Sequence, residues 1–414
     1  RVRDGLKGVG SSSKNLDKAN ASLKKLQATT GGLSGAFRNA TANVGAFLGA
    51  YVGFNLVVGA TRNVIDFNRA IAEVQTIAKV SAPRLLEIKK GMLEISDATG
   101  KSAIDATKTF YQIQSAGITD VVQAQRVLQA SLRLSVGSLA DAETSTLALT
   151  KALAIYGDEL KGDPTTASDI LFRGVELGQT NMQELAMSIP MVLGPAKAMG
   201  ISFSDLTGQI ASFSKRAGST SQAVTQLNSI FTAVAKKQAT ARTVLKENAH
   251  LFTVQALRAK GLTVFMKDLS VATGNNVETL NKLFGRKEAT TGFLSSASDG
   301  FRDLEETVKS ARVSLGASGR AFQEIANSIG GQADILRARL TNIVLRFAVN
   351  GEGAVVSTLQ TMNGLIQSLS ENFNRIARIA TIFFVATIIG KGVTAFRILR
   401  TEFIKMQVTA IWLR

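Results

Sequence analysis

Proline, the residue that most reliably stops a helix, is almost missing from this chain. Only four prolines occur in 414 residues, and long stretches contain no helix-breaking residue. Apolar residues recur there at helical spacing, as in the series Ala103, Ala106, Phe110 and Ile113. We find no convincing run with the alternation of a half-buried strand. The sequence therefore predicts an all-α fold.

The composition sets further limits. The hydrophobic fraction of 45% is enough for a real core, and the length allows two or three domains. The chain has no cysteine, which excludes a disulfide framework and a thiolate metal site and is compatible with a reducing cytosol. Because the first residue is arginine rather than methionine, we expect a piece of a longer chain or a processed one.

The positive charge is concentrated at the two ends. The net charge is +17, of which residues 1–38 and 331–414 carry +6 each, while the long middle carries only +5. Basic ends favour binding to an anionic partner, such as nucleic acid, lipid head groups or an acidic protein surface. Aromatic residues make up only 6%, so the stacking platform of a single-strand binder is missing.

Two N-terminal segments have distinct patterns. The pattern of residues 1–38 predicts a basic, heptad-like helix, typical either of a loose coiled coil or of an amphipathic helix packed on its own domain. Residues 39–65 follow, with no charge between Arg38 and Arg62. The glycines of this segment recur every four residues, a stripe that lets helices approach closely, in a membrane or in a protein assembly: Gly45, Gly49 and Gly53.

The C-terminal part predicts two more helices. Residues 331–375 indicate an amphipathic helix broken at "NGEG", and residues 376–414 a hydrophobic helix flanked by basic residues. The uncharged run there is too short to span a bilayer alone. With Arg378 and Lys391 extended toward lipid head groups it would span; the alternative is a buried helix in a bundle.

Between these ends, residues 66–330 predict a compact domain of about ten helices. Two predicted helix–helix turns in this domain have the same sequence pattern. They are "SAGITD" and "AMGISFSD". Each has a glycine suited to the left-handed residue past a helix end, an isoleucine that folds back on the last turn, and a hydroxyl that caps the next helix. The corner residues are Gly117, Ile118 and Thr119 in the first, and Gly200, Ile201 and Ser202 in the second.

The search for catalytic chemistry gives no constellation. His250 is the only histidine and lacks a second histidine or cysteine for a zinc set, so we interpret it as a surface residue. The "GKS" at 100–102 lacks the upstream glycine and strand of a phosphate-binding loop, and Ser102 suits a helix cap better. We therefore expect no enzyme, no cofactor and no metal site.

Five short motifs, in order, resemble the core domain of the phage tail tape measure family over about residues 66–300. They are Ala116–Gly117–Ile118, Tyr156–Gly157, Ala196 with Gly200–Ile201–Ser202, Gly218–Ser219 with Ala223, and Phe284–Gly285 with Ala289. One departure is the segment "VTQLNSIF" after Ala223, where the family often has a Gly-Thr-x-Leu rhythm.

The resemblance implies a structural ruler. Such a protein lies in the tail tube lumen, sets tail length during assembly in the host cytoplasm, and leaves ahead of the DNA, with some segments passing into the host membrane. The implied partners are further copies of the chain (three favoured over six), tail tube and tip proteins, and the host inner membrane, with genomic DNA only a neighbour. The alternatives are a membrane-active helical effector, or the non-catalytic part of a tape measure that carries a cell-wall hydrolase elsewhere.

Overall fold

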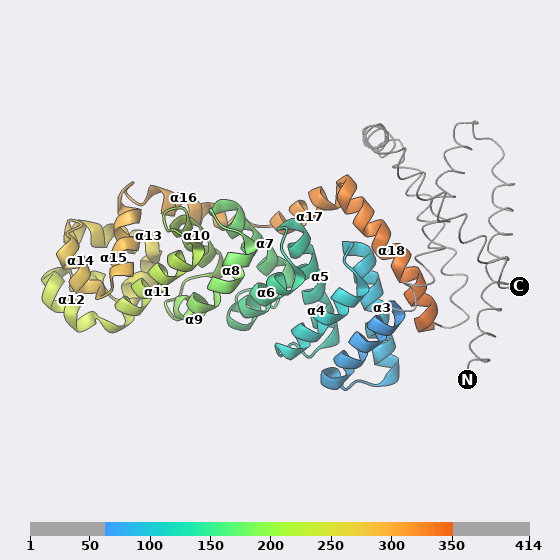
Figure 1. Ribbon diagram of the computed structural model, residues 1–414. Coiled ribbons are helices and arrows are strands. Elements are labelled where there is room, and N and C mark those ends of the chain that lie inside the picture. The colour runs from blue at the N-terminus through green and yellow to red at the C-terminus, as the bar shows by residue number, and fades with distance from the viewer. Residues whose placement is uncertain (1–62, 351–414) are drawn as a thin grey trace, which may run out of the picture. The chain divides into compact units, whose positions relative to one another are not determined.

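The computed structural model describes residues 63–350, all of which fall within one compact unit (Figure 1). Within this range every regular element is a helix and no strand occurs, which confirms the all-α prediction. Helical backbone over 63–78 precedes the first complete helix. The helices that follow are α3 (Ala82–Thr99), α4 (Ala103–Ser115), α5 (Val121–Gly137), α6 (Ala142–Tyr156), α7 (Pro164–Leu177), α8 (Met182–Ser188), α9 (Pro190–Ala198), α10 (Phe203–Ser214), α11 (Thr220–Lys236), α12 (Gln238–Leu245), the 3₁₀ helix η1 (Lys246–Leu251), α13 (Val254–Thr273), α14 (Val277–Phe284), α15 (Lys287–Ala297), α16 (Arg302–Ala311), α17 (Ala317–Asn327) and α18 (Ile329–Asn350).

The helices are shorter and more numerous than the ten expected for residues 66–330. At several breaks a residue other than glycine adopts the left-handed conformation. Leu139, Lys161 and Phe301 have φ values of 56°, 52° and 63°. Glycines with positive φ follow Lys161 and precede Phe301, at Gly162 and Gly300.

A line of aromatic rings forms the core where α13, α14 and α15 meet. Successive ring centroids lie 5.5 to 6.0 Å apart, the spacing at which tilted and edge-to-face pairs are favourable. The rings belong to Phe252, Phe265, Phe284, Phe293 and Phe301, each at most 2% exposed. This cluster holds the α12–α15 part of the body together.

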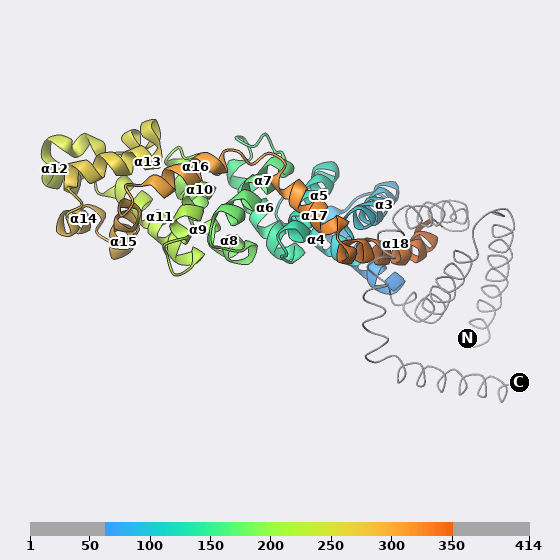
Figure 2. The same cartoon turned by 90° about the horizontal axis from the view of Figure 1, so that it is seen from above.

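The last three helices run back along the helices that precede them (Figure 2). Helix α16 packs on α10 and α7, α17 on α7 and α5, and α18 on α3. Residues 331–350, which the sequence suggested as the start of a separate amphipathic helix, therefore lie within α18 and pack against the body. The returning segment thus joins helices that are far apart in the chain.

One buried and one partly buried carboxylate fasten this returning segment. Asp169 is 1% exposed and accepts hydrogen bonds from Gly316 N at 2.7 Å, Ser318 N at 3.0 Å and Ser318 Oγ at 2.6 Å. Near α3, Asp97 accepts from Asn342 Nδ2 at 2.7 Å and pairs with Arg346. Because both carboxylates accept hydrogen bonds from the returning segment, that segment has one defined register on the body.

Candidate functional site

The corner between α4 and α5 has the hydrogen bonds of a Schellman cap. Gly117 has φ +96°, and its N–H donates to Gln114 O at 3.0 Å. The N–H of Ile118 donates to Ile113 O at 3.3 Å, closing the last turn. The cap of the next helix was assigned wrongly: Asp120, not Thr119, accepts from Gln123 N at 2.7 Å. The Schellman geometry places Ile118 against the helix and leaves the residue two positions later as the N-cap.

The corner between α9 and α10 repeats this geometry. Gly200 has φ +77° and its N–H donates to Lys197 O at 3.0 Å, while the N–H of Ile201 donates to Ala196 O at 3.0 Å. Ser202 is the N-cap of α10 and accepts from Asp205 N at 3.1 Å. Five residues, 116–120, therefore join α4 to α5, and four residues, 199–202, join α9 to α10.

Two motifs that carry the family resemblance meet at one junction. The hydroxyl of Tyr156 donates to Ile201 O at 3.1 Å, and Glu159 Oε1 accepts from Phe203 N at 2.8 Å. Lys197 Nζ lies 4.8 Å from the centroid of the Tyr156 ring and 3.8 Å from Glu159 Oε2. Burial, and secondarily the Glu159 charge, raises the pKa of Tyr156 well above its usual range. The phenol is therefore a hydrogen-bond donor at any physiological pH.

The remaining motif residues also cap helices or pack between them. Ser219 caps α11 by accepting from Gln222 N at 3.2 Å, and Ala223 is completely buried. Gly285 has φ +67° at the end of α14, next to the buried Phe284 and Ala289. A Cβ at Gly285 would lie 3.0 Å from Lys237 Cε, so this corner also has close packing over it. These positions shape helix ends and contacts between helices.

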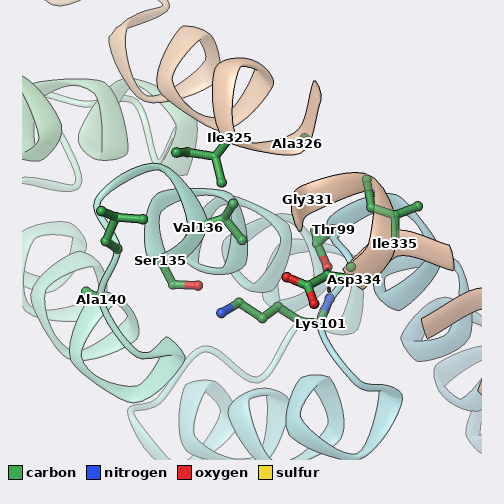
Figure 3. A pocket seen from close by; sticks show the side chains of 12 residues that line it. Thr99, Lys101, Ser135, Val136, Ala140, Ile325, Ala326, Gly331, Asp334 and Ile335 are labelled. Carbon is green, nitrogen blue, oxygen red and sulfur yellow. Dashed lines mark hydrogen bonds between the residues drawn. The ribbon is translucent and has the colours of Figure 1, made fainter. Parts of the chain in front are cut away.

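A cavity of about 260 Å³ lies where the end of α3, the end of α5, α17 and α18 converge (Figure 3). Apolar side chains form most of its wall, including Val136, Ile325 and Ile335. The hydroxyls of Thr99 and Ser135 already donate to Ile95 O and Leu132 O. Figure 3 shows Lys101 and Asp334 reaching into this space from different elements. One ammonium and one carboxylate over an apolar wall fit a packing contact or a small amphipathic group.

The two residues that the sequence offered as candidates for chemistry are a helix cap and an exposed histidine. Ser102 caps α4, accepting from Asp105 N at 3.0 Å. His250 is exposed, and its Nδ1 lies 2.9 Å from Glu247 O. Over residues 63–350, no group of three or more histidine, cysteine or carboxylate side chains is placed to hold a metal ion.

The sequence did not single out the carboxylates that tie distant helices. Asp303 accepts from Ser212 Oγ at 2.6 Å, Lys215 Nζ at 2.9 Å and Arg216 Nη1 at 2.8 Å. Burial raises the pKa of Asp303, but these hydrogen bonds outweigh burial and hold it below its usual value. The only sequence signal was the pair Lys215–Arg216 in a stretch with no acidic residue between Asp205 and Glu247, which requires a partner from elsewhere.

The remaining predicted sites lie outside the described residues. They are the stripe of Gly45, Gly49 and Gly53 and the lipid-boundary candidates Arg378 and Lys391. Among the helices of residues 63–350, none combines the length and apolar character needed to cross a bilayer. The predicted heptad helix of residues 1–38 and the hydrophobic helix of 376–414 are likewise beyond this range.

Residues 89–285, from within α3 to the end of α14, match the family model described as phage-related minor tail protein. No curated protein and no solved structure matches the chain. The matched family is one of tail proteins and not of enzymes. The chain therefore carries a domain of the phage-related minor tail protein family, in agreement with its resemblance to tape measure proteins, and is a component of the virion tail.

Proposed function

We propose that this chain is the tape measure protein of a phage tail, a structural ruler in the lumen of the tail tube. The observation that carries the proposal is the family match over residues 89–285 together with the order of the motifs inside it. Two of those motifs are in direct contact, because the Tyr156 hydroxyl donates to Ile201 O. The residues that carry the resemblance therefore pack together in the fold.

A folded body and a helical rod contribute differently to length. A single helix rises about 1.5 Å per residue, so residues 63–350 drawn out as one helix would span roughly 430 Å. Packed against one another as in this body, the same helices cover a shorter distance than one continuous helix would. In the proposed ruler, residues 1–62 and 351–414 therefore contribute more length per residue than the body does.

The partners follow from the same proposal. Further copies of the chain, three in preference to six, would lie together in the lumen with tail tube and tail tip proteins around them. The net charge of +17 supports an acidic lining of the tube as the neighbouring surface. On infection the chain would leave ahead of the DNA. A passage into the host inner membrane rests on the apolar segments 39–62 and 376–399 alone.

The test is the tail itself. Cells that produce the phage with the gene for this chain removed should form no complete tails, or tubes of unregulated length, in negative-stain electron micrographs. Supplying the chain from a plasmid should restore one narrow distribution of lengths. Tails of normal number and length without the chain would refute the ruler, and would leave a different role in the tail.

A further inference from the structure

A second, smaller cavity lies where α5, α7 and α17 meet, apart from the one in Figure 3. Its volume is about 80 Å³, enough for a small oxyanion or a few waters. The residues that line it include Arg126 and Arg133 on α5, Thr165 and Ser168 on α7, and Ser318 and Gly319 on α17.

One side of this cavity is cationic. Arg126 and Arg133 are seven residues apart and therefore lie on the same face of α5. Arg133 is half-buried, and its Cζ lies 5.5 Å from the centroid of the Phe322 ring. Its Nε is buried without a hydrogen-bond partner among the described residues. A buried guanidinium N–H without an acceptor is costly, so an acceptor is expected in the cavity.

A second donor in the wall is also unused. Ser168 is 1% exposed, and its Oγ has no hydrogen-bond partner among residues 63–350. Some buried helical serines bond back to their own helix, as Ser214 does to Ile210 O at 2.7 Å, whereas Ser131 and Ser145, like Ser168, have no partner among the described residues. Because Ser168 does not, its hydroxyl stays available to a group in the cavity it lines.

The opposite side of the cavity is the start of a helix. Ser318 and Gly319 lie in the first turn of α17, an eleven-residue helix whose N-cap Gly316 has no capping side chain. Ala317 N already donates to Ser314 O and Ser318 N to Asp169 Oδ1, so the Asp169 carboxylate offsets the partial positive charge of this helix start.

The nearby carboxylates are already occupied. Asp169 accepts three hydrogen bonds from Gly316 and Ser318. Asp163 accepts from Thr165 N, Thr166 N and Thr166 Oγ1, and lies 3.7 Å from Arg126 Nη2. Asp163 therefore offsets part of the Arg126 charge, whereas Arg133 has no carboxylate partner in the described part of the chain. Among the side chains that line the cavity, the buried donors without a partner in the described residues are Arg133 Nε and Ser168 Oγ.

We propose that this cavity, lined by Arg126, Arg133, Ser168 and the start of α17, binds a small tetrahedral oxyanion. The chemical class is phosphate or sulfate, either free or as the terminal phosphate of a monoester. Arg133 would supply the charge-assisted hydrogen bond through Nε, Ser168 a neutral one, and Arg126 would stand at the mouth of the cavity. Bound there, the anion would join α5, α7 and α17, the helices that the returning segment connects.

The experiment is titration of the full chain with inorganic phosphate. Isothermal titration calorimetry measures the binding, and thermal unfolding measures its effect on the melting temperature. Chloride at equal ionic strength is the reference. Millimolar phosphate should bind and raise the melting temperature, and chloride should not. Arg133→Met keeps the packing on Phe322 and should weaken phosphate binding at least about tenfold, because a charge-assisted hydrogen bond is lost. Ser168→Ala should weaken it by about threefold to tenfold.

The matched control is Arg302→Met, which removes one exposed arginine charge on α16 and should leave phosphate affinity unchanged. Should Arg133→Met fail to fold by circular dichroism, the smaller change Ser168→Ala carries the test. A nucleoside monophosphate titrated in parallel separates the sources: binding equal to inorganic phosphate indicates a monoester site, and weaker binding indicates a free anion. Phosphate acting no differently from chloride, or binding unchanged in the folded variants, would overturn the proposal and make the cavity a water-filled gap.

Discussion

Helices α10 and α16 cross so closely at Gly208 that a single methyl group should separate them. A Cβ built on Gly208 would lie 2.8 Å from Val308 Cα, 2.9 Å from Ala311 Cβ and 3.2 Å from Thr307 O. Two of these atoms belong to the backbone of α16 and cannot rotate away. Gly208→Ala therefore forces the two helices apart, and the strain falls on the same helix pair that Asp303 fastens to Lys215.

Two opposing terms give the size of this effect. Alanine in a helix is favoured over glycine by about 1 kcal/mol. Overpacking of a well-packed contact costs about 1–3 kcal/mol, and contact with backbone atoms favours the upper part of that range. The free energy of unfolding should therefore fall by about 1–2 kcal/mol in Gly208→Ala, although the local helix propensity improves.

A matched control has the opposite sign. Gly330 lies in the first turn of α18, and the nearest atom to its added Cβ would be Ser328 Oγ at 3.9 Å, an ordinary contact. Gly330→Ala should therefore stabilise the chain, by up to about 1 kcal/mol. Urea unfolding of the full chain, followed by circular dichroism at 222 nm, gives both midpoints. If Gly208→Ala raises the midpoint as Gly330→Ala does, the close crossing of α10 and α16 is wrong.

Three further predictions concern two hydrogen-bonded side chains and two apolar segments. Tyr156→Phe should lower the free energy of unfolding by about 1–2 kcal/mol, because Ile201 O loses its buried donor, while Tyr111→Phe should change it little in the same urea assay; equal effects would remove the junction from the account. Since the pKa of Asp303 is lower in the folded state than in the unfolded chain, its stabilising contribution is present above about pH 4 and lost as pH falls toward the folded pKa. Asp303→Asn should therefore be less stable at pH 7 and lose less stability between pH 5 and pH 3, and an unchanged slope would contradict this. Peptides spanning 39–62 and 376–399 should co-sediment with anionic vesicles more than with neutral ones, and Gly49→Leu should weaken self-association of the first; no partitioning by either peptide would place the ejection role elsewhere.

Local chemistry explains why some positions could be predicted from sequence. A glycine just past a helix end followed by an apolar residue indicates a left-handed turn, and Gly117 and Gly200 have that conformation. Ser102 can cap α4 because the cap needs only the residue three positions ahead. Where two adjacent residues can both cap, as Thr119 and Asp120 can, the spacing alone does not decide.

Long-range contacts explain what the sequence could not predict. The partners Asp169 and Ser318 are 149 positions apart, and neither helix carries a local sign of the other. The two arginines of the smaller cavity share a face of α5, which is visible in the sequence, but Ser168 and the start of α17 reach them only through the fold. The residue type of Leu139 likewise does not predict its left-handed conformation.

The length of assembled tails tests the ruler most directly. Deleting residues 9–36, four heptads of the predicted N-terminal helix, removes 28 residues, which amounts to about 42 Å at the helical rise. Duplicating the same residues should lengthen tails by the same amount, and both shifts are measurable in electron micrographs of purified particles. The ruler predicts shorter tails with the deletion and longer tails with the duplication, each in one narrow distribution. Tails of unchanged length in both strains would contradict it.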